Sequence, residues 1–497
     1  MKIQQFFVSA ALGAFCCGSM AAQSGNAEER PDSLVYRAEV FGSAATGSHT
    51  PFWMVSNRYG LVPLDAGNGY LRAGVFNNQS FGYGRRFRWN VGVDAVVVAP
   101  RYKNVYIQQL YAGLGYRSLL LSIGSKEDYT SLWDRKLSSG DMVQSANARP
   151  IPEVNLSIPE FAVVPYTKGW LQVKGDFAVG RSFDTKYLEH VAYPGEAYIR
   201  NVLWHHKSFF VQIEDTEGGK PFSAVLGIRH AAQWGGTSTD PQAGKQPQSL
   251  KDLLRVIVGK EGGSGASQSS QINVLGNHYG SYDLKLAYRG TGWKVALYWQ
   301  HYFEDTSGME FANARDGLWG AELELPRFPW IRKVVFEFFD TRYQSGPFHF
   351  IEYTRPGRGG GADNYYNNGE YVTGVSYFGQ GIGSPLITSP EYNTNGFLGF
   401  ENNRVKAFHL GMEGSFSPYV DYRLLLTAMN SWGTTMQPFI DNKSGVSGLV
   451  EIVYRHPKLE GWELKGNIAG DSGDLYGKNL GFGLSVAKRG ILKAWNR

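Results

Sequence analysis

The chain has 497 residues, of which 14% are aromatic and 62 are glycine, and its mean hydropathy is −0.30. The net charge of +5 is small for this length and gives no argument for nucleic-acid binding. No run of 18 apolar residues follows the first 22 residues, which excludes a transmembrane helix there. High aromatic and glycine content with weak hydropathy is typical of a barrel whose strands carry apolar residues at every second position.

The first 22 residues are expected to be a signal peptide. Lys2 supplies a positive charge, Phe6–Cys17 is an apolar run too short to span a bilayer, and Ser19-Met20-Ala21 offers small residues for cleavage after Ala21 or Ala22. A retained anchor helix is the alternative. Both cysteines lie in this segment, so we expect no disulfide and no thiolate metal site in the exported chain.

Patterns with a period of two begin in the N-terminal half. The strand candidates there are 86–99, 104–116 and 169–180. In the first of them, Trp89 and Val91 share one face, whereas Asn90 and Asp94 share the other. The up-and-down order of strands between residues 197 and 234 stays open at this stage.

Residues 248–260 form the best helix candidate. Leu250, Leu253, Leu254 and Ile257 recur at helical spacing, and Ser249 can cap the N-terminus. Glycine-rich stretches flank this segment, which predicts a small helix within a loop at the mouth of the barrel. Simple loop packing and a role in ligand binding are equally open for it.

The C-terminal half shows the same alternation more clearly. Residues 282–288 and 293–299 place apolar and polar side chains on opposite faces, and the turn 289–292 joins them. A soluble sandwich alternates too. However, the candidates run for about 10 to 12 residues, which is the length of a tilted bilayer crossing and exceeds the usual globular strand.

Connections in this half alternate between short and long. The short ones are 289–292, 326–330, 415–419 and 457–461, and the long ones are 302–317, 344–403 and 431–448. This pattern matches periplasmic turns and extracellular loops. We therefore expect an all-β fold: a transmembrane antiparallel β-barrel of about 18 strands over residues 34–490, in the outer membrane. A tail at 23–33 and a tail at 491–497 would place both termini in the periplasm.

The polar face of each strand would point into the lumen. That set comprises Asp94, Lys174, Asp176, Asp283, Lys285, Arg289, Asp421, Arg423, Glu451, Arg455, Glu463 and Lys465. Opposite signs are interleaved, so we expect pairing across strands and a narrow or plugged lumen. A solvated porin wall with charge of one sign is the alternative.

Catalytic and metal-binding motifs are missing from the sequence, so no catalytic residue, metal or cofactor is expected. His205 and His206 are adjacent, so on a strand they would face opposite sides and could not chelate one metal.

Residues 359–371 carry the richest loop chemistry. They contain Asp363, Asn364, Tyr365, Tyr366, Asn367 and Asn368. Amides and carboxylates bond to sugar hydroxyls, and aromatic faces stack on sugar rings. With Trp319 and Trp432 at other loop ends, these residues form the candidate polysaccharide-binding set. The alternative is a Gly/Asn loop folded on itself.

Several motifs resemble the Wzi capsule-assembly family of outer-membrane proteins, over about 34–491. They are Thr50-Pro51-Phe52-Trp53-Met54-Val55-Ser56-Asn57-Arg58-Tyr59-Gly60, His230-Ala231-Ala232-Gln233-Trp234-Gly235-Gly236, Leu275-Gly276-Asn277-His278-Tyr279-Gly280 and Gly481-Phe482-Gly483-Leu484-Ser485-Val486. The resemblance implies an 18-stranded, lectin-like barrel without enzymatic activity that holds capsular or exported polysaccharide and organises capsule assembly. It also implies a helical plug at the periplasmic end, for which residues 44–65 are the nearest substitute here.

Three functions stay open, and a polysaccharide-binding barrel is the leading one. Its expected partners are polysaccharide, outer-membrane lipid and lipopolysaccharide, with no nucleic acid and a monomeric state. A diffusion or polysaccharide export channel is the second, and it predicts a conducting pore. A barrel-embedded hydrolase is the third, and His301 or His409 would be the first candidates for its base.

Overall fold

The computed structural model describes residues 32–351 and 359–495. The expected signal peptide at 1–22 and all but the last two residues of the tail at 23–33 lie outside this part of the chain. Within it, no helix is both long and apolar enough to cross a membrane.

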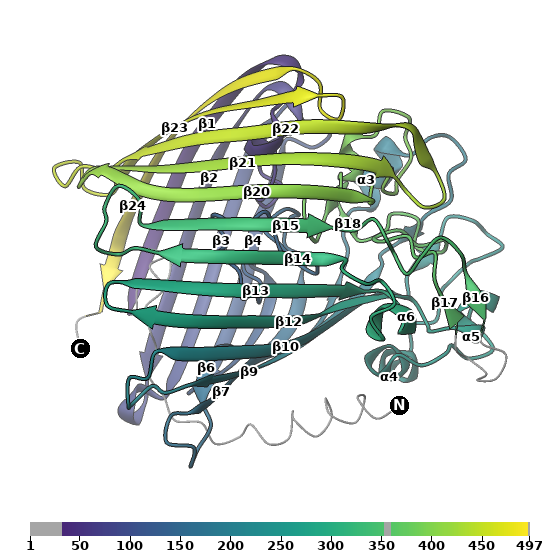
Figure 1. Ribbon diagram of the computed structural model, residues 1–497, viewed down its shortest axis with the longest axis horizontal. Helices are drawn as coiled ribbons and strands as arrows, with labels where there is room; N and C mark the ends of the chain where they lie inside the picture. The colour runs from purple at the N-terminus through teal and green to yellow at the C-terminus, as the bar shows by residue number, and fades with distance from the viewer. Residues whose placement is uncertain (1–31, 352–358, 496–497) are drawn as a thin grey trace.

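One closed sheet of 18 strands dominates the described residues (Figure 1). The strands are β1 (Ser33–His49), β2 (Asp65–Phe81), β3 (Phe87–Ala99), β4 (Val105–Tyr116), β5 (Leu119–Ser125), β6 (Glu153–Val163), β7 (Leu171–Arg181), β9 (Leu203–Glu214), β10 (Phe222–Trp234), β12 (Asn277–Gly290), β13 (Trp293–Phe303), β14 (Gly317–Glu324), β15 (Lys333–Asp340), β20 (Val405–Ser417), β21 (Val420–Gly433), β22 (Pro438–Tyr454), β23 (Trp462–Gly473) and β24 (Asn479–Ala494). Each pairs antiparallel with its neighbours in the chain, and β1 also pairs with β24, with Val40 opposite both Leu71 and Val486. The predicted antiparallel barrel is confirmed.

The two ends of the barrel differ in the length of their connections. The first and last residues of the sheet, Ser33 and Ala494, lie at the same end of the barrel. The short turns, such as 117–118, 291–292 and 418–419, lie at this end too. We call this the short-turn end, and the opposite one the loop end. The loop end carries 126–152, 182–202, 235–276 and 341–404. β24 continues through residues 491–494, which the sequence analysis placed in a tail.

One predicted long loop is wrong. Residues 431–448 were expected to form a loop, but β21 and β22 continue through most of this stretch and are joined at 434–437. The stretch is rich in polar and small residues, and it forms a hairpin whose pairing does not depend on an apolar face. The open question at 197–234 is also resolved, because β9 and β10 pair antiparallel there.

The outer wall is apolar and has aromatic side chains near both ends. At the short-turn end, Phe87 packs on Tyr116 with ring centroids 4.9 Å apart. At the loop end, Trp299 stacks on Trp319 at 5.2 Å. Between these levels, outward residues such as Leu297 are exposed. An apolar band flanked by aromatic girdles is the surface expected to contact lipid.

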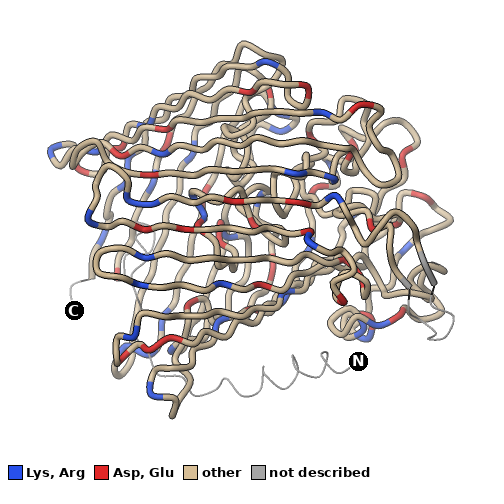
Figure 2. Tube along the Cα trace, viewed as in Figure 1, with Lys and Arg blue, Asp and Glu red and all other residues tan. Residues whose placement is uncertain are grey.

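The inner wall carries the charges, and ion pairs connect different strands. Arg423 on β21 pairs with Glu451 on β22 at 3.1 Å, and Lys285 on β12 pairs with Glu322 on β14 at 2.7 Å. Figure 2 shows residues of opposite sign close together along the barrel strands. The predicted pairing across strands is confirmed for these charges. Charged groups are thereby kept away from the lipid-facing side.

Short helices and two-residue strands lie in the connections. They are α2 (Phe52–Val55), η2 (Tyr83–Arg85), α3 (Thr185–Val191), α4 (Leu250–Val258), α5 (Gln268–Ile272), α6 (Thr306–Met309), η3 (Pro390–Tyr392), and the strand pairs β8 (Ile199–Arg200) with β11 (Thr237–Ser238), β16 (Phe350–Ile351) with β17 (Gly359–Gly360), and β18 (Ser376–Tyr377) with β19 (Gln380–Gly381). The predicted loop helix is confirmed as α4. Ser249 caps it by accepting from the backbone N–H of Asp252, whose carboxylate in turn accepts from the backbone N–H of Ser249.

Candidate functional site

The lumen is filled from the loop end by three connections. The first, 50–64, contains α2, whose four residues are buried. Trp53 donates from its indole Nε1 to the Thr427 hydroxyl at 3.1 Å, and the backbone N–H of Phe52 donates to Asp471 at 3.1 Å. A helical plug therefore forms within the predicted range 44–65, but it enters from the loop end and not from the short-turn end.

The second connection, 126–152, is held by polar groups of the wall. Glu337 accepts from the Ser138 hydroxyl at 2.6 Å and from the backbone N–H of Ser139 at 2.7 Å. Arg229 forms an ion pair with Asp141. These contacts fix the segment in the lumen, because a buried carboxylate that lost its donors would carry the full cost of desolvation.

The third connection, 341–404, packs on the second. The Tyr366 hydroxyl donates to the Met142 carbonyl at 2.5 Å and accepts from the backbone N–H of Ser384 at 2.9 Å. Asn147 donates from its amide to the Gly381 carbonyl at 2.9 Å. Together the three connections form a plug, the name used below for 50–64, 126–152 and the described part of 341–404.

The predicted tyrosines belong to the interior of this plug. Tyr365 and Tyr366 are both 0% exposed, so they present no ring face to a ligand. Asn313 donates to the Tyr365 hydroxyl at 2.8 Å. The two rings pack edge-on against Tyr302 of the wall. They anchor the loop 359–371 and set the position of its polar residues.

Several of the predicted polar side chains also form hydrogen bonds within the third connection, 341–404. Asn364 accepts from the Asn403 amide at 2.6 Å. Asn367 accepts from the backbone N–H of Phe400 and donates to the carbonyl of the same residue, both at 2.8 Å. Asn368 accepts from the backbone N–H groups of Glu370 and Tyr371. The amides of these three asparagines therefore stabilise the fold of the connection before they could serve a ligand.

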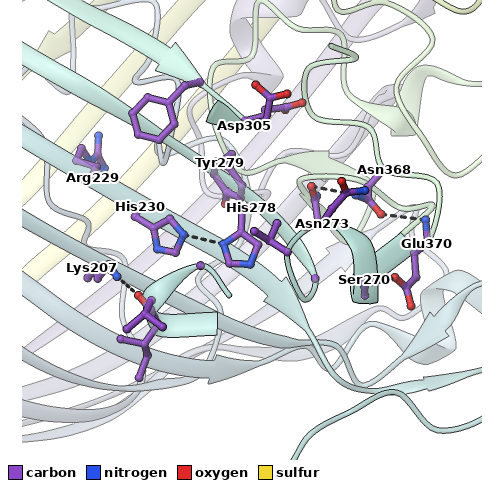
Figure 3. Close-up of a pocket in the computed structure, with 18 of the residues that line it drawn as sticks. Lys207, Arg229, His230, Ser270, Asn273, His278, Tyr279, Asp305, Asn368 and Glu370 are labelled. Carbon is purple, nitrogen blue, oxygen red and sulfur yellow. Dashed lines mark hydrogen bonds between the residues drawn. The ribbon is translucent and has the colours of Figure 1, made fainter. Parts of the chain in front are cut away.

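A cavity of about 1810 Å³ begins beside this loop and continues along strands β6, β7, β9 and β10, with Leu156 and Val173 in its lining; we call it the rim cavity. Asp363, Asn367, Asn368 and Glu370 line it on one side. Figure 3 shows Asn368, Glu370 and Asp305 at one side of this space and His278 and Tyr279 at the barrel wall. The structure thus brings three of the predicted residues, Asp363, Asn367 and Asn368, to a common cavity.

An adjoining part of the lining of the rim cavity comes from 235–276, which we call the flap; Figure 3 shows Asn273 and Ser270 next to Asn368 and Glu370. Ser269 and Asn273 line the cavity and are exposed, as is Gln242. The hydroxyls of Ser267 and Ser270 donate to Glu370 at 3.1 and 3.0 Å, which ties the flap to the loop 359–371. Sequence reasoning missed these residues. The polar stretch 261–273 beside the predicted helix was the available signal.

Trp319 and Trp432 lie apart from the rim cavity. Trp319 is on the outer wall, stacked on Trp299, and its indole donates to the Arg315 carbonyl at 3.2 Å. Trp432 is near the end of β21, and the Arg342 guanidinium lies 5.1 Å from its ring. Neither lines the cavity. Trp319 instead forms part of the aromatic girdle.

Acidic residues border the rim cavity within the loops. Glu304 accepts from the Tyr302 hydroxyl at 2.8 Å and from the backbone N–H of Tyr366 at 2.6 Å. Burial first, together with the nearby Asp363 and Asp305 carboxylates, raises the pKa of Glu304 to about 8. Burial, followed by the charge of Asp305, raises the pKa of Asp363 to about 7. These two carboxyls therefore change charge near neutral pH.

The histidines that were candidates for a catalytic base are occupied elsewhere. His409 is 2% exposed, with its imidazole between the Thr427 hydroxyl at 2.7 Å and the Leu137 carbonyl at 2.8 Å. His301 bonds to the Gly308 carbonyl at 2.9 Å. His206 faces the lumen and contacts Glu153 and Asp176, whereas His205 faces outward, as expected for neighbours on a strand. Among the described residues, no cluster of three or more possible ligands could hold a metal ion.

Comparisons with known proteins agree with this architecture. A family model described as capsule assembly protein Wzi matches residues 55–389. A solved structure, reported as Escherichia coli Wzi, an outer membrane protein involved in group 1 capsule assembly and a carbohydrate-binding β-barrel, is 14% identical with a TM-score of 0.56. That similarity covers 90% of this chain and 83% of the other.

The crystal structure of Pseudomonas aeruginosa OprD is 8% identical to this chain in sequence, with a TM-score of 0.46. The similarity covers 93% of this chain and 96% of the OprD chain. OccK5 (OpdH) of the same organism is 10% identical with a TM-score of 0.46, covering 93% and 98%. None of the curated proteins compared with the chain matches it.

Proposed function

Because the chain belongs to the Wzi family of capsule assembly proteins, we propose that it binds capsular or exported polysaccharide at the cell surface and organises its attachment there. The chain is an outer-membrane β-barrel. The loop end faces outward and the short-turn end faces the periplasm, because long loops and short turns divide in this way in bacterial barrels. Polysaccharide would therefore meet the rim cavity first.

The observation that carries the proposal is the set of polar groups from separate loops around the rim cavity. Asn273 comes from the flap, Asp305 from 304–316, and Asp363 from the loop 359–371. Amides and carboxylates bond in their own plane to neighbouring sugar hydroxyls. Tyr365, Tyr366 and Asn367 are occupied in holding the loop, so we assign the direct contacts to Asn273, Asp305 and Asp363. Asp305 also accepts from Ser307 and Gly308, and Asp363 accepts from Ser345, but a carboxylate has about four lone-pair sites and keeps acceptor capacity for a sugar hydroxyl.

A filled lumen favours binding over transport. Passage of a polysaccharide would require displacement of plug residues held by Glu337, Arg229 and Gln300. We therefore expect no steady ion current through the purified protein in planar bilayers. A stable conductance of the wild-type protein would favour the diffusion or export channel instead.

Binding also needs no chemical step. We propose a non-catalytic protein that works as a monomer, since the barrel closes within one chain and leaves no unpaired sheet edge. Outer-membrane lipid and lipopolysaccharide would surround its apolar band.

The test removes two exposed amide side chains of the flap that line the cavity, Asn273 and Gln242, and leaves Asp305 in place because its carboxylate caps α6 by accepting from Ser307 and Gly308. We expect the double variant Asn273→Ala with Gln242→Ala to lose polysaccharide retention about 30-fold, since two hydrogen bonds contribute about 2 kcal/mol together. The readouts are cell-surface polysaccharide against polysaccharide released into the medium, and glycan binding by the purified protein.

The matched control carries Asn442→Ala with Gln437→Ala, which changes the same residue types at exposed positions of the β21–β22 hairpin. Both proteins should show heat-modifiable migration, which reports a folded barrel. Equal retention and equal glycan binding in the two double variants would contradict the assignment. Removal of 359–368 is a poorer test, because it also takes away the buried Tyr365 and Tyr366.

A further inference from the structure

Helix α4 of the flap lies outside the barrel and not over its lumen. Side chains on β10 alternate, with Arg229 and Gln233 bonding to lumen segments, so Ala232 and Trp234 face outward. These two outward residues form a small apolar cluster with Val256 of α4 and Leu275. Figure 1 shows α4 beside the ends of the strands, at the loop end. The helix thus packs on the wall from the lipid side.

The helix has a second apolar face that contacts no part of this cluster. Leu250 and Leu254 are one turn apart, and they are 75% and 57% exposed. Lys251 beside them is exposed as well. Leu253 and Val256 lie on the side that packs against the wall. Because they are one turn apart, the two leucines form a contiguous apolar patch on this face of the helix.

The flap holds this helix in place. Ser249 and Asp252 form the capping box at its start, and Gly259 ends it in the left-handed conformation. Lys207 on β9 donates to the Ile257 carbonyl in its last turn. Ser270 of α5 bonds to Glu370. The exposed leucines therefore have a defined position relative to the barrel wall.

We propose that the Leu250–Leu254 face of α4 inserts into the outer leaflet and anchors the flap at the boundary between acyl chains and headgroups. The proposal rests on the location of the barrel in the outer membrane. The occupant is lipid because α4 packs on the outward face of β10, and further toward the short-turn end the outward residues Leu226 and Phe222 of the same strand are 63% and 67% exposed. Lys251 adds a positive charge beside the leucines, which suits the phosphate groups of outer-leaflet lipids.

This arrangement gives the flap two attachments. Its outer side contacts lipid through α4, and its inner side borders the rim cavity through Ser269 and Asn273. A glycan in the rim cavity would then lie directly beside the membrane surface. The flap could hold its shape there without a protein partner.

Spin labels test where the α4 face lies. The exported protein with Leu254→Cys, reconstituted into vesicles of phosphatidylethanolamine and phosphatidylglycerol, would carry one nitroxide. Its collision rates with oxygen, which partitions into lipid, and with a water-soluble nickel chelate would be measured. Leu226→Cys provides the lipid reference on the barrel wall. Ile440→Cys, on the β21–β22 hairpin and 102% exposed, provides the water reference. Wild-type protein treated with the same spin label shows how much label, if any, reacts with Cys16 and Cys17.

We expect the label at position 254 to collide with oxygen at least threefold more often, relative to the chelate, than the label at 440, and to approach the label at 226. A ratio equal to that at 440 would place the helix in water and overturn the proposal. Protection from both reagents would indicate a covering protein segment and overturn it too. If Leu254→Cys does not assemble, Leu250→Cys gives the same comparison. Because no glycan is present, loss of polysaccharide binding leaves this result unchanged.

Discussion

The plug should depend on one buried carboxylate of the wall, Glu337. It is 0% exposed and accepts from Ser138 and Ser139 of the plug and from the Tyr298 hydroxyl of β13 at 2.6 Å. Glu337→Met keeps a side chain of similar length but removes the acceptor. The two plug donors would then be buried without partners.

The free energy by which Glu337→Met destabilises the closed plug can be calculated from those two donors. Each buried unsatisfied donor costs about 1–3 kcal/mol, so the pair destabilises the closed plug by roughly 4 kcal/mol. The fraction of molecules with an open plug should rise about a thousandfold. The barrel itself should persist, because its strands pair with each other independently of the plug.

Hydrogen exchange followed by mass spectrometry measures this effect at the backbone amides of residues 137–142. We expect their protection to fall by two to three orders of magnitude in Glu337→Met, accompanied by transient conductance in planar bilayers. Glu463→Met is the matched control, because that carboxylate pairs with Arg455 at 2.7 Å on the wall. Unchanged protection of 137–142, or an equal loss in both variants, would refute the reasoning.

Three further predictions concern the wall, the flap and the loops. Ile468→Arg places a charge on the lipid-facing side in the middle of β23, where it costs about 2–4 kcal/mol at the midplane; the yield of heat-modifiable protein should drop, and normal assembly would contradict the assigned facing. Ser249→Ala removes the α4 cap at a cost of about 1 kcal/mol, so amide exchange in α4 should rise about fivefold, and no change would argue against the cap. The pKa values of Glu304 and Asp363 are higher in the folded protein than in an unfolded chain, so protonation of these carboxyls stabilises the folded loop. This stabilisation is complete below about pH 4 and is lost as the pH rises through about 7–8. Limited proteolysis of 341–404 should therefore be faster at pH 9 than at pH 6, and Glu304→Gln should flatten that dependence; equal rates at both pH values in the wild type would count against it.

The wall of the barrel could be predicted because its signal is local. Side chains alternate along a strand, so the residues next to Val93 or Leu464 in the sequence indicate whether that side chain points to the lipid or to the lumen. The same rule correctly placed the lumen charges. It failed at 431–448, where β21 and β22 extend beyond the apolar band, so that pairing continues without an apolar pattern to mark it.

Apart from the family resemblance, the plug could be anticipated only from the paired charges of the lumen, because its contacts join residues far apart in the chain. Trp53 meets Thr427, and Ser139 meets Glu337. Nothing in the sequence near either partner specifies the other. Only the closed barrel brings such pairs together, and for that reason the sequence predicted a plugged lumen and the range 44–65 but not the other two segments, 126–152 and 341–404, that fill it.

The loop 359–371 shows why composition alone could not identify a glycan site. Amides and tyrosines recognise sugars because they bond in several directions, and the same property lets them satisfy the backbone of a buried loop. Asn367 uses both ends of its amide on Phe400, and the Tyr366 hydroxyl bonds to two plug residues. An amide or hydroxyl whose donor and acceptor are both engaged within the protein has little left for a ligand, whereas a carboxylate with one bonded oxygen still accepts. The contacts with polysaccharide must therefore be sought among groups that face the rim cavity from different loops, such as Asn273 and Asp305, which no local pattern in the sequence connects.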